Sequence, residues 1–286
     1  DFRLGEVLGH GASGQVFSAY TSLPEFRGIP LAIKRIARSS IRTARAGRRV
    51  ANEITIQSRL RHRALVRMYA SFHDAEYIYM LMEACEGGTV FEYLQLRGGR
   101  VSEPEARGVV RSVVDGLMHL QQNRIMHRDL KPGNLLITAD GDVKIGDFGL
   151  ATMIQPPDAH PLPPHMLSGD ADGSNKRNNH QTLCGTPNFI APEIVVHQQY
   201  STPVDMWSLG CLMVMLLTGK PPFETEDGAV EGTFKRAAAG VYQIPRELGL
   251  SADARDLIAT LLQLHPEKRG KLEELVAHPW LDSSLP

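Results

Sequence analysis

The sequence is poor in cysteine, in net charge and in long apolar segments. Three cysteines in 286 residues are too few and too scattered for a disulfide framework or a zinc cluster, which favours a reducing compartment. A formal net charge of −1 removes the electrostatic case for binding nucleic acid. The longest apolar run is interrupted at Ser208 and Gly210 and is too short for a membrane span. We therefore expect a cytoplasmic protein that binds neither nucleic acid nor membrane.

What is present is the composition of an ordinary globular protein, with 42% hydrophobic and 22% charged residues. The length fits one large domain or two lobes that share a cleft. Residues 155–179 differ, because five prolines are followed by polar residues without apolar periodicity. Such a composition buries too little to offset its ordering entropy, so we predict a mobile, disordered insertion. Because the chain begins at Asp1 rather than methionine, we expect a fragment of a longer protein.

A glycine-rich turn lies between two predicted strands near the N-terminus and contains Gly9, Gly11 and Gly14. The pattern GxGxxG occurs in two kinds of phosphate-binding fold. In a dinucleotide-binding fold the third glycine begins a helix, whereas residues 16–20 are typical of a strand. The sequence therefore favours a flap that folds over phosphates. A glycine-rich hairpin without a ligand is the alternative.

A lysine and a glutamate are predicted to meet behind this flap. Lys34 lies in the apolar strand segment 31–36, where a solvated edge lysine is the simplest alternative. Residues 50–60 have helical periodicity, and one face carries Val50, Glu53, Gln57 and Leu60. A carboxylate on an inward face needs a charged partner, because burying it alone is costly. We therefore predict that Glu53 pairs with Lys34.

Two acidic residues and one amide lie close together in sequence, on loops between apolar runs: Asp129, Asn134 and Asp147. Magnesium prefers oxygen ligands, so Asn134 and Asp147 form a candidate metal pair. Asp129 is then free to orient a hydroxyl group or accept its proton, and Lys131 can balance the charge on a transferring group. Each aspartate alone could equally be an ordinary turn residue.

The ordered occurrence of these features predicts transfer of the terminal phosphoryl group of Mg-ATP to a protein hydroxyl. The flap covers the phosphates, and Lys34, held by Glu53, contacts them. Three short motifs follow in the expected order, namely His127-Arg128-Asp129, Asp147-Phe148-Gly149 and Ala191-Pro192-Glu193.

With these motifs the chain resembles eukaryotic protein kinases over essentially its whole length. The resemblance implies an α+β, bilobal kinase fold. Residues 1–82 would form a mainly antiparallel β lobe with one key helix, residues 83–88 a hinge, and residues 89–286 a larger, mainly helical lobe. The activation segment would run over residues 147–193.

The same resemblance implies a nucleotide pocket. Val16, Ala32 and Leu136 would sandwich the adenine, the backbone of residues 83–85 would hydrogen-bond its edge, and Met82 would be the gatekeeper. The complete set of residues expected to bind ATP is Leu8, Gly9, Gly11, Gly14, Val16, Ala32, Lys34, Met82, Glu83, Cys85 and Leu136.

Two further features resemble serine/threonine kinases rather than tyrosine kinases, namely Lys131 and the segment Gly185-Thr186-Pro187. The resemblance implies that Glu193 pairs with Arg269. It also implies phosphorylation at Thr182, where Arg128 could bind the added charge. Thr186 is expected to be a substrate-loop hydroxyl bonded toward Asp129 and Lys131.

Within the superfamily the chain is most similar to polo-like kinases of the Sak type. The segments that carry this likeness are Asp1-Phe2, residues 50–53, 77–79, 83–85 and 182–190. This implies protein substrates, a role in centriole duplication, location at the centrosome, and self-association or autophosphorylation in trans. Departures from the family are Ser13-Gly14 in the flap, the proline-rich insertion and Gln57. Alternatives are an Aurora-like or other serine/threonine kinase, a pseudokinase scaffold and a small-molecule kinase.

Overall fold

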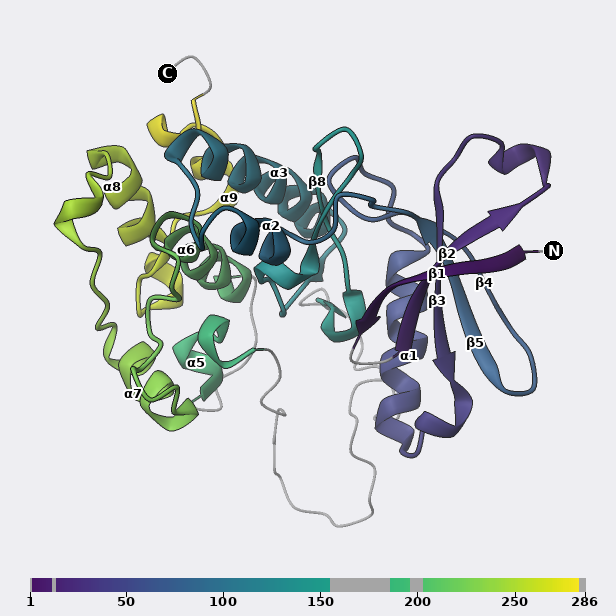
Figure 1. Ribbon diagram of the computed structural model, residues 1–286. Helices are drawn as coiled ribbons and strands as arrows, with labels where there is room; N and C mark the ends of the chain where they lie inside the picture. The colour runs from purple at the N-terminus through teal and green to yellow at the C-terminus, as the bar shows by residue number, and fades with distance from the viewer. Residues whose placement is uncertain (1, 12–13, 155–185, 196–202, 283–286) are drawn as a thin grey trace, which may run out of the picture.

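The computed structural model describes residues 2–11, 14–154, 186–195 and 203–282. These residues form two regions that lie side by side (Figure 1). The sheet region comprises residues 2–83 and the helical region comprises the described residues from 84 to 282. The predicted insertion at 155–179 and the predicted phosphorylation site Thr182 lie outside the described residues.

The sheet region contains five antiparallel strands in the order β1-β2-β3-β5-β4. Their bounds are β1 (Phe2–Gly11), β2 (Gly14–Thr21), β3 (Leu31–Ala37), β4 (Met68–His73) and β5 (Tyr77–Glu83). The strand predicted after the glycine-rich turn is therefore present, and no helix begins at Gly14. On the central strand β3, Lys34 lies opposite Val16 on one side and Met80 on the other.

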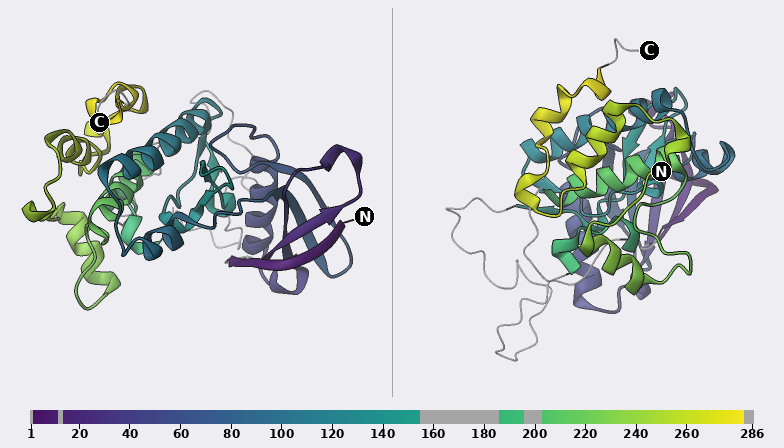
Figure 2. Two further views of the ribbon diagram at one scale, coloured as in Figure 1. Left: turned by 45° about the horizontal axis from the view of Figure 1, so that its top comes forward. Right: turned by 90° about the vertical axis from the view of Figure 1, so that its left-hand side faces the viewer.

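Helix α1 (Ala44–Gln57) is the single long helix among the described residues of the sheet region. The prediction of 50–60 was wrong at both ends. Thr43 begins the helix by accepting a hydrogen bond from the backbone of Ala46, and the arginines that follow are good helix formers. At the other end, Leu60 lies after the turn at residues 58–59, beyond the helix, but is still buried. Helix α1 lies between the sheet and the helical region (Figure 1 and the left view of Figure 2).

The helical region consists of seven α-helices and four short strands in its described residues. The helices are α2 (Val90–Leu96), α3 (Glu103–Gln122), α5 (Pro192–Val195), α6 (Pro203–Thr218), α7 (Val230–Ala239), α8 (Ala252–Leu261) and α9 (Leu272–Val276). The strands form two antiparallel pairs, β6 (Ile125–Met126) with β9 (Thr152–Met153) and β7 (Leu135–Ile137) with β8 (Val143–Ile145).

Two helices organise the core of the helical region. Helix α3 begins at a capping box, in which Ser102 and Glu105 bond each other's backbone N–H groups. Helix α6 is apolar on nearly all sides and is buried along most of its length. Trp207 on α6 is fully buried, and its ring stacks on Phe223 with centroids 5.0 Å apart. No helix in the described part of the chain is long and apolar enough to cross a membrane.

Candidate active site

The predicted pairing of Lys34 with Glu53 joins strand β3 to helix α1. Lys34 Nζ donates a hydrogen bond to Glu53 Oε1 at 2.5 Å, and both side chains are buried. Asp147 Oδ1 lies 4.0 Å from the same ammonium group. Burial by itself lowers the pKa of Lys34, but the two carboxylates outweigh it and the net shift is upward. Lys34 therefore carries a positive charge at neutral pH.

Asp129 lies in the loop between β6 and β7, next to two other residues predicted to belong to the site. Lys131 Nζ donates to Asp129 Oδ2 at 2.8 Å. Asn134 Nδ2 donates to the same oxygen at 2.9 Å and to the backbone carbonyl of Asp129 at 2.7 Å. Because only 9% of Asp129 is exposed, these donors fix the orientation of its carboxylate.

Thr186 is brought to this loop from 57 positions away in the sequence. Its hydroxyl accepts a hydrogen bond from Lys131 Nζ at 2.7 Å and lies 3.4 Å from Asp129 Oδ1. Its backbone N–H donates to Asp129 Oδ1 at 3.2 Å. The fold therefore assembles an acid, an ammonium group and a hydroxyl in direct contact, in the arrangement expected for Thr186.

The loop geometry is held by a residue that the sequence analysis did not assign to the site. The two carboxylate oxygens of Asp205, in the first turn of α6, accept the backbone N–H groups of His127 and Arg128, each at 2.8 Å. Arg128 has φ of 65°, in the left-handed region that non-glycine residues rarely adopt. Burial raises the pKa of Asp205, and these donors oppose the shift. The sequence feature that could have pointed to Asp205 is that it is the single charged residue in the otherwise apolar segment of helix α6.

Asp147 is the second strained residue of the site, with φ of 55°. Its side chain accepts the N–H of Gly149 at 3.2 Å and is 39% exposed, so its carboxylate remains accessible. Phe148 beside it is fully buried, and its ring lies edge-on to His127 at 5.3 Å. No group of three or more His, Cys, Asp or Glu side chains suited to a metal occurs among the described residues.

Gln57, one of the departures noted from the sequence, is buried at the end of helix α1, one turn after Glu53. Its Nε2 donates to the carbonyl of Val66 at 3.2 Å and lies 3.7 Å from the sulfur of Met82. A buried amide needs such partners, because an unsatisfied one is costly. Gln57 thus links helix α1 to the predicted gatekeeper by polar contacts.

The residues predicted to bind adenine come from both regions. Ala32 on β3 lies opposite Met82 on β5, and Leu136 on β7 and Cys85 both pack against the buried cluster that contains Met82. Burial raises the pKa of the Cys85 thiol to about 12. The other predicted positions lie on β1 and β2 for Leu8, Gly9, Gly11, Gly14 and Val16, and at the end of β5 for Glu83. At Gly14 a Cβ atom would lie 2.3 Å from the carbonyl oxygen of Arg35, so only glycine fits there.

Glu193 and Arg269 form a second buried ion pair, as expected. The guanidinium group donates to both carboxylate oxygens at 2.7 Å, and it also donates to the carbonyls of Pro203 and Gln263 at 2.8 Å. Its charge lies 5.1 Å from the ring centroid of Trp207. This pair fixes helix α5, which follows Thr186, to the core of the helical region.

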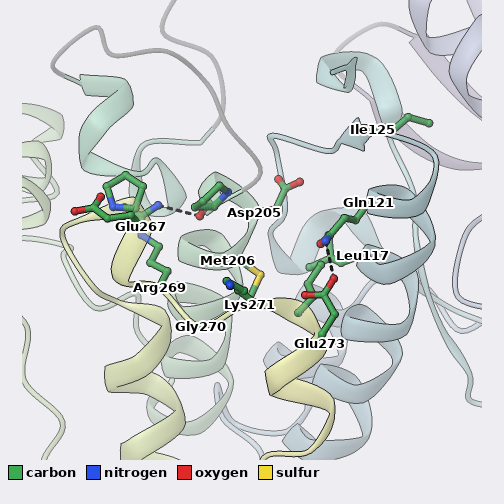
Figure 3. A pocket seen from close by; sticks show the side chains of 13 residues that line it. Leu117, Gln121, Ile125, Asp205, Met206, Glu267, Arg269, Gly270, Lys271 and Glu273 are labelled. Carbon is green, nitrogen blue, oxygen red and sulfur yellow. Dashed lines mark hydrogen bonds between the residues drawn. The ribbon is translucent and has the colours of Figure 1, made fainter. Parts of the chain in front are cut away.

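A cavity of about 500 Å³ lies between α3, the start of α6 and the segment before α9 (Figure 3). Asp205 and Arg269 line it, and at its rim Gln121 donates to Glu273 at 2.8 Å. None of the residues predicted to bind the nucleotide lines this cavity. The cavity is therefore separate from the candidate active site.

Comparison with known proteins agrees with this geometry. A family model described as the protein kinase domain matches residues 2–281, so the chain belongs to the protein kinase family. It is 38% identical over 282 residues to serine/threonine-protein kinase PLK4 of Drosophila virilis, covering 98% of this chain and 33% of that protein. The proteins of the same name from Nematostella vectensis and Danio rerio are 37% and 36% identical over 98% and 100% of this chain. The chain spans only 26% and 28% of those two proteins.

Proposed function

We propose that this chain transfers the terminal phosphoryl group of ATP to serine or threonine hydroxyls of protein substrates. The observation that carries the proposal is the contact of Asp129 with Lys131, Asn134 and Thr186. The buried pair of Lys34 and Glu53 is the second part of the proposed site. The kinase family and the printed names of the relatives support the same activity. We also propose that residues 83–88 form the hinge between the two regions and that the nucleotide binds between them.

Lys34 binds the inner phosphates in this proposal, and Glu53 holds its ammonium group in place. Asn134 and Asp147 supply two oxygen ligands, a number that suits Mg²⁺ because this ion completes its shell with phosphate oxygens and water. When bound, Mg²⁺ neutralises charge on the phosphates. The amide nitrogen of Asn134 is already bonded to Asp129, so its oxygen is the atom left for the metal.

Asp129 orients the substrate hydroxyl and receives its proton. The hydroxyl oxygen forms a bond to the terminal phosphorus, and the bond from that phosphorus to the bridging oxygen breaks. ADP leaves with the electron pair. Lys131 offsets charge on the transferring group, and Thr186, held by Lys131, positions the substrate beside Asp129.

Replacement of Asp129 by asparagine tests this function. ADP release from Mg-ATP with casein as acceptor should fall on the order of 10²–10⁴-fold, because a general base is lost while the side-chain shape is kept. Asp140→Asn is the matched control, since this aspartate is exposed in the turn after β7. Equal rates for wild type and Asp129→Asn would contradict the assignment, and an inactive wild type would favour the pseudokinase alternative.

We further propose a polo-like kinase of the Sak type, acting at the centrosome in centriole duplication. The support is the similarity to proteins named PLK4 together with the motifs described above. Because the chain spans a third or less of these relatives, the test needs the full-length protein. In cells depleted of the endogenous protein, the full-length Asp129→Asn variant should fail to restore the normal number of centrioles per cell. Restoration of normal numbers by this variant would contradict the role.

Regulation by phosphorylation of Thr182, in trans between two copies, is the remaining proposal. A phosphate adds about −1.5 to −2 charges at neutral pH and would need a cationic partner such as Arg128. Thr182→Ala with full activity would contradict this switch.

A further inference from the structure

Asn52 precedes Glu53 on helix α1 and connects the two regions of the molecule. Its Nδ2 donates a hydrogen bond to the backbone carbonyl of Ala151 at 2.6 Å, across 99 positions of sequence. Ala151 is fully buried and directly follows the single turn Phe148–Leu150, so its carbonyl belongs to the segment that carries Asp147.

The neighbouring carbonyl is held from the other side. Arg128 Nε donates to the carbonyl of Leu150 at 2.7 Å. Two successive carbonyls are therefore bonded, one by helix α1 of the sheet region and one by the loop that carries Asp129. Gly149 lies close as well, because a Cβ atom there would be 3.4 Å from the carboxylate of Glu53. Helix α1 and this segment are thus in close contact.

The helix geometry explains why adjacent residues have different partners. With 3.6 residues per turn, neighbouring side chains point roughly 100° apart. Glu53 consequently points to Lys34 on β3, while Asn52 points to Ala151 in the helical region. Rotating or lifting helix α1 would break both bonds together.

Glu53 depends on accurate placement. A buried ion pair is favourable only when its geometry is good, because both charges have lost their hydration. The Lys34 ammonium group also lies 4.0 Å from Asp147, so a small movement of helix α1 would let it change partners. A second attachment of the helix, adjacent to Glu53, limits that movement.

We propose that Asn52 is a positioning residue: its bond to Ala151 fixes helix α1 so that Glu53 holds Lys34 in the geometry that binds the phosphates of Mg-ATP. The proposal rests on the function proposed above for Lys34. It adds a residue that makes no contact with the reacting atoms and acts through Glu53.

Asn52→Leu tests the proposal, because leucine has a similar size and cannot donate. kcat/KM for Mg-ATP should fall about 2- to 12-fold, the factor that corresponds to one ordinary hydrogen bond. Asn52→Asp should lose more, because a carboxylate oxygen would face the carbonyl of Ala151. Thr55→Val is the control, since the exposed Thr55 hydroxyl donates within its own helix, to the carbonyl of Ala51. This variant should remain within about twofold of wild type.

A double-mutant cycle with Glu53→Gln separates positioning from a general structural role. In that background Asn52→Leu should change kcat/KM less than about twofold, because the residue through which it acts is already lost. Additive losses in the two backgrounds, or wild-type kinetics for Asn52→Leu, would overturn the proposal.

The same cycle measured by binding of Mg-AMP-PNP, a non-hydrolysable ATP analogue, needs no turnover. The dissociation constant should rise about 2- to 12-fold for Asn52→Leu in the wild-type background and remain unchanged in the Glu53→Gln background. If wild type fails to phosphorylate casein, the proposed function fails. The binding cycle still decides whether Asn52 acts through Glu53.

Discussion

The two buried ion pairs differ in how completely their charges are satisfied. Arg269 bonds both oxygens of Glu193, two carbonyls at 2.8 Å and the face of Trp207, and its side chain has no exposed surface. Lys34 has one bond to Glu53, and Asp147 lies 4.0 Å away as a possible second partner. The first arrangement leaves little freedom. The second leaves donor positions of the ammonium group available for phosphate oxygens.

The difference teaches that burial alone does not separate a structural pair from a functional one. Both pairs are within a few per cent of full burial. What differs is the number of remaining hydrogen-bonding positions, which a planar guanidinium uses fully and an ammonium group does not. We therefore expect substitutions at the first pair to affect mainly stability and those at the second to affect mainly catalysis.

The largest effect on stability is expected for Glu193→Gln. It removes the counter-charge of a fully buried arginine, which typically costs about 3–5 kcal/mol in the free energy of unfolding. Urea titration of the purified chain measures this. Glu267→Gln is the control, since that carboxylate is 70% exposed and should change stability by no more than about 0.5 kcal/mol. A loss below about 1 kcal/mol for Glu193→Gln would contradict the structural role.

Glu53→Gln should instead reduce kcat/KM for Mg-ATP by about 10²-fold, because a misplaced Lys34 no longer aligns the phosphates. Glu53→Gln should lower the free energy of unfolding less than Glu193→Gln does. Burial raises the pKa of Glu53 despite the nearby ammonium group, so a neutral side chain avoids an unfavourable buried charge. Lys34 can then turn to Asp147. Equal destabilisation by Glu53→Gln and Glu193→Gln in urea would remove the distinction between the two pairs.

The smallest expected effect on the free energy of unfolding is at Glu105, a surface carboxylate at the start of α3. It tests whether carboxylates other than the buried Glu193 also stabilise the helical region. The hydroxyl of Ser102, then its backbone N–H, lowers the pKa of Glu105 to about 2 from an ordinary 4.5. A lowered pKa contributes stability above about pH 4.5, and that contribution is lost as the pH falls toward 2.

Glu105→Gln should therefore cost about 1 kcal/mol in the free energy of unfolding at pH 7. The difference from wild type should shrink as the pH falls from 4.5 toward 2 and disappear below pH 2, where Glu105 itself is protonated. Urea titrations at a series of pH values follow this convergence. If the difference in the free energy of unfolding between wild type and Glu105→Gln grows as the pH falls, the assigned direction of the Glu105 pKa shift is wrong.

Much of the site could be predicted because its motifs are local. The residue types within 127–134 and 147–149 define the loop chemistry, and strand and helix periodicity placed Lys34 and Glu53 on facing sides. The ends of helix α1 were harder to predict, because its start is set by the Thr43 cap rather than by apolar periodicity. Asp205 and Asn52 escaped notice for a different reason. Their partners lie 78 and 99 positions away, and no local pattern encodes such contacts.

By itself the sequence determined the membership of the chain in its family, the strand and helix order, and the identity of the charged residues of the candidate site. Those properties follow from residue type and spacing along the chain. Only the tertiary structure decided which charges are fully bonded and which keep a free position, because that depends on carbonyls and carboxylates brought in from distant segments. The contrast between Arg269 and Lys34 is of this kind, as is the bond from Asn52 to Ala151.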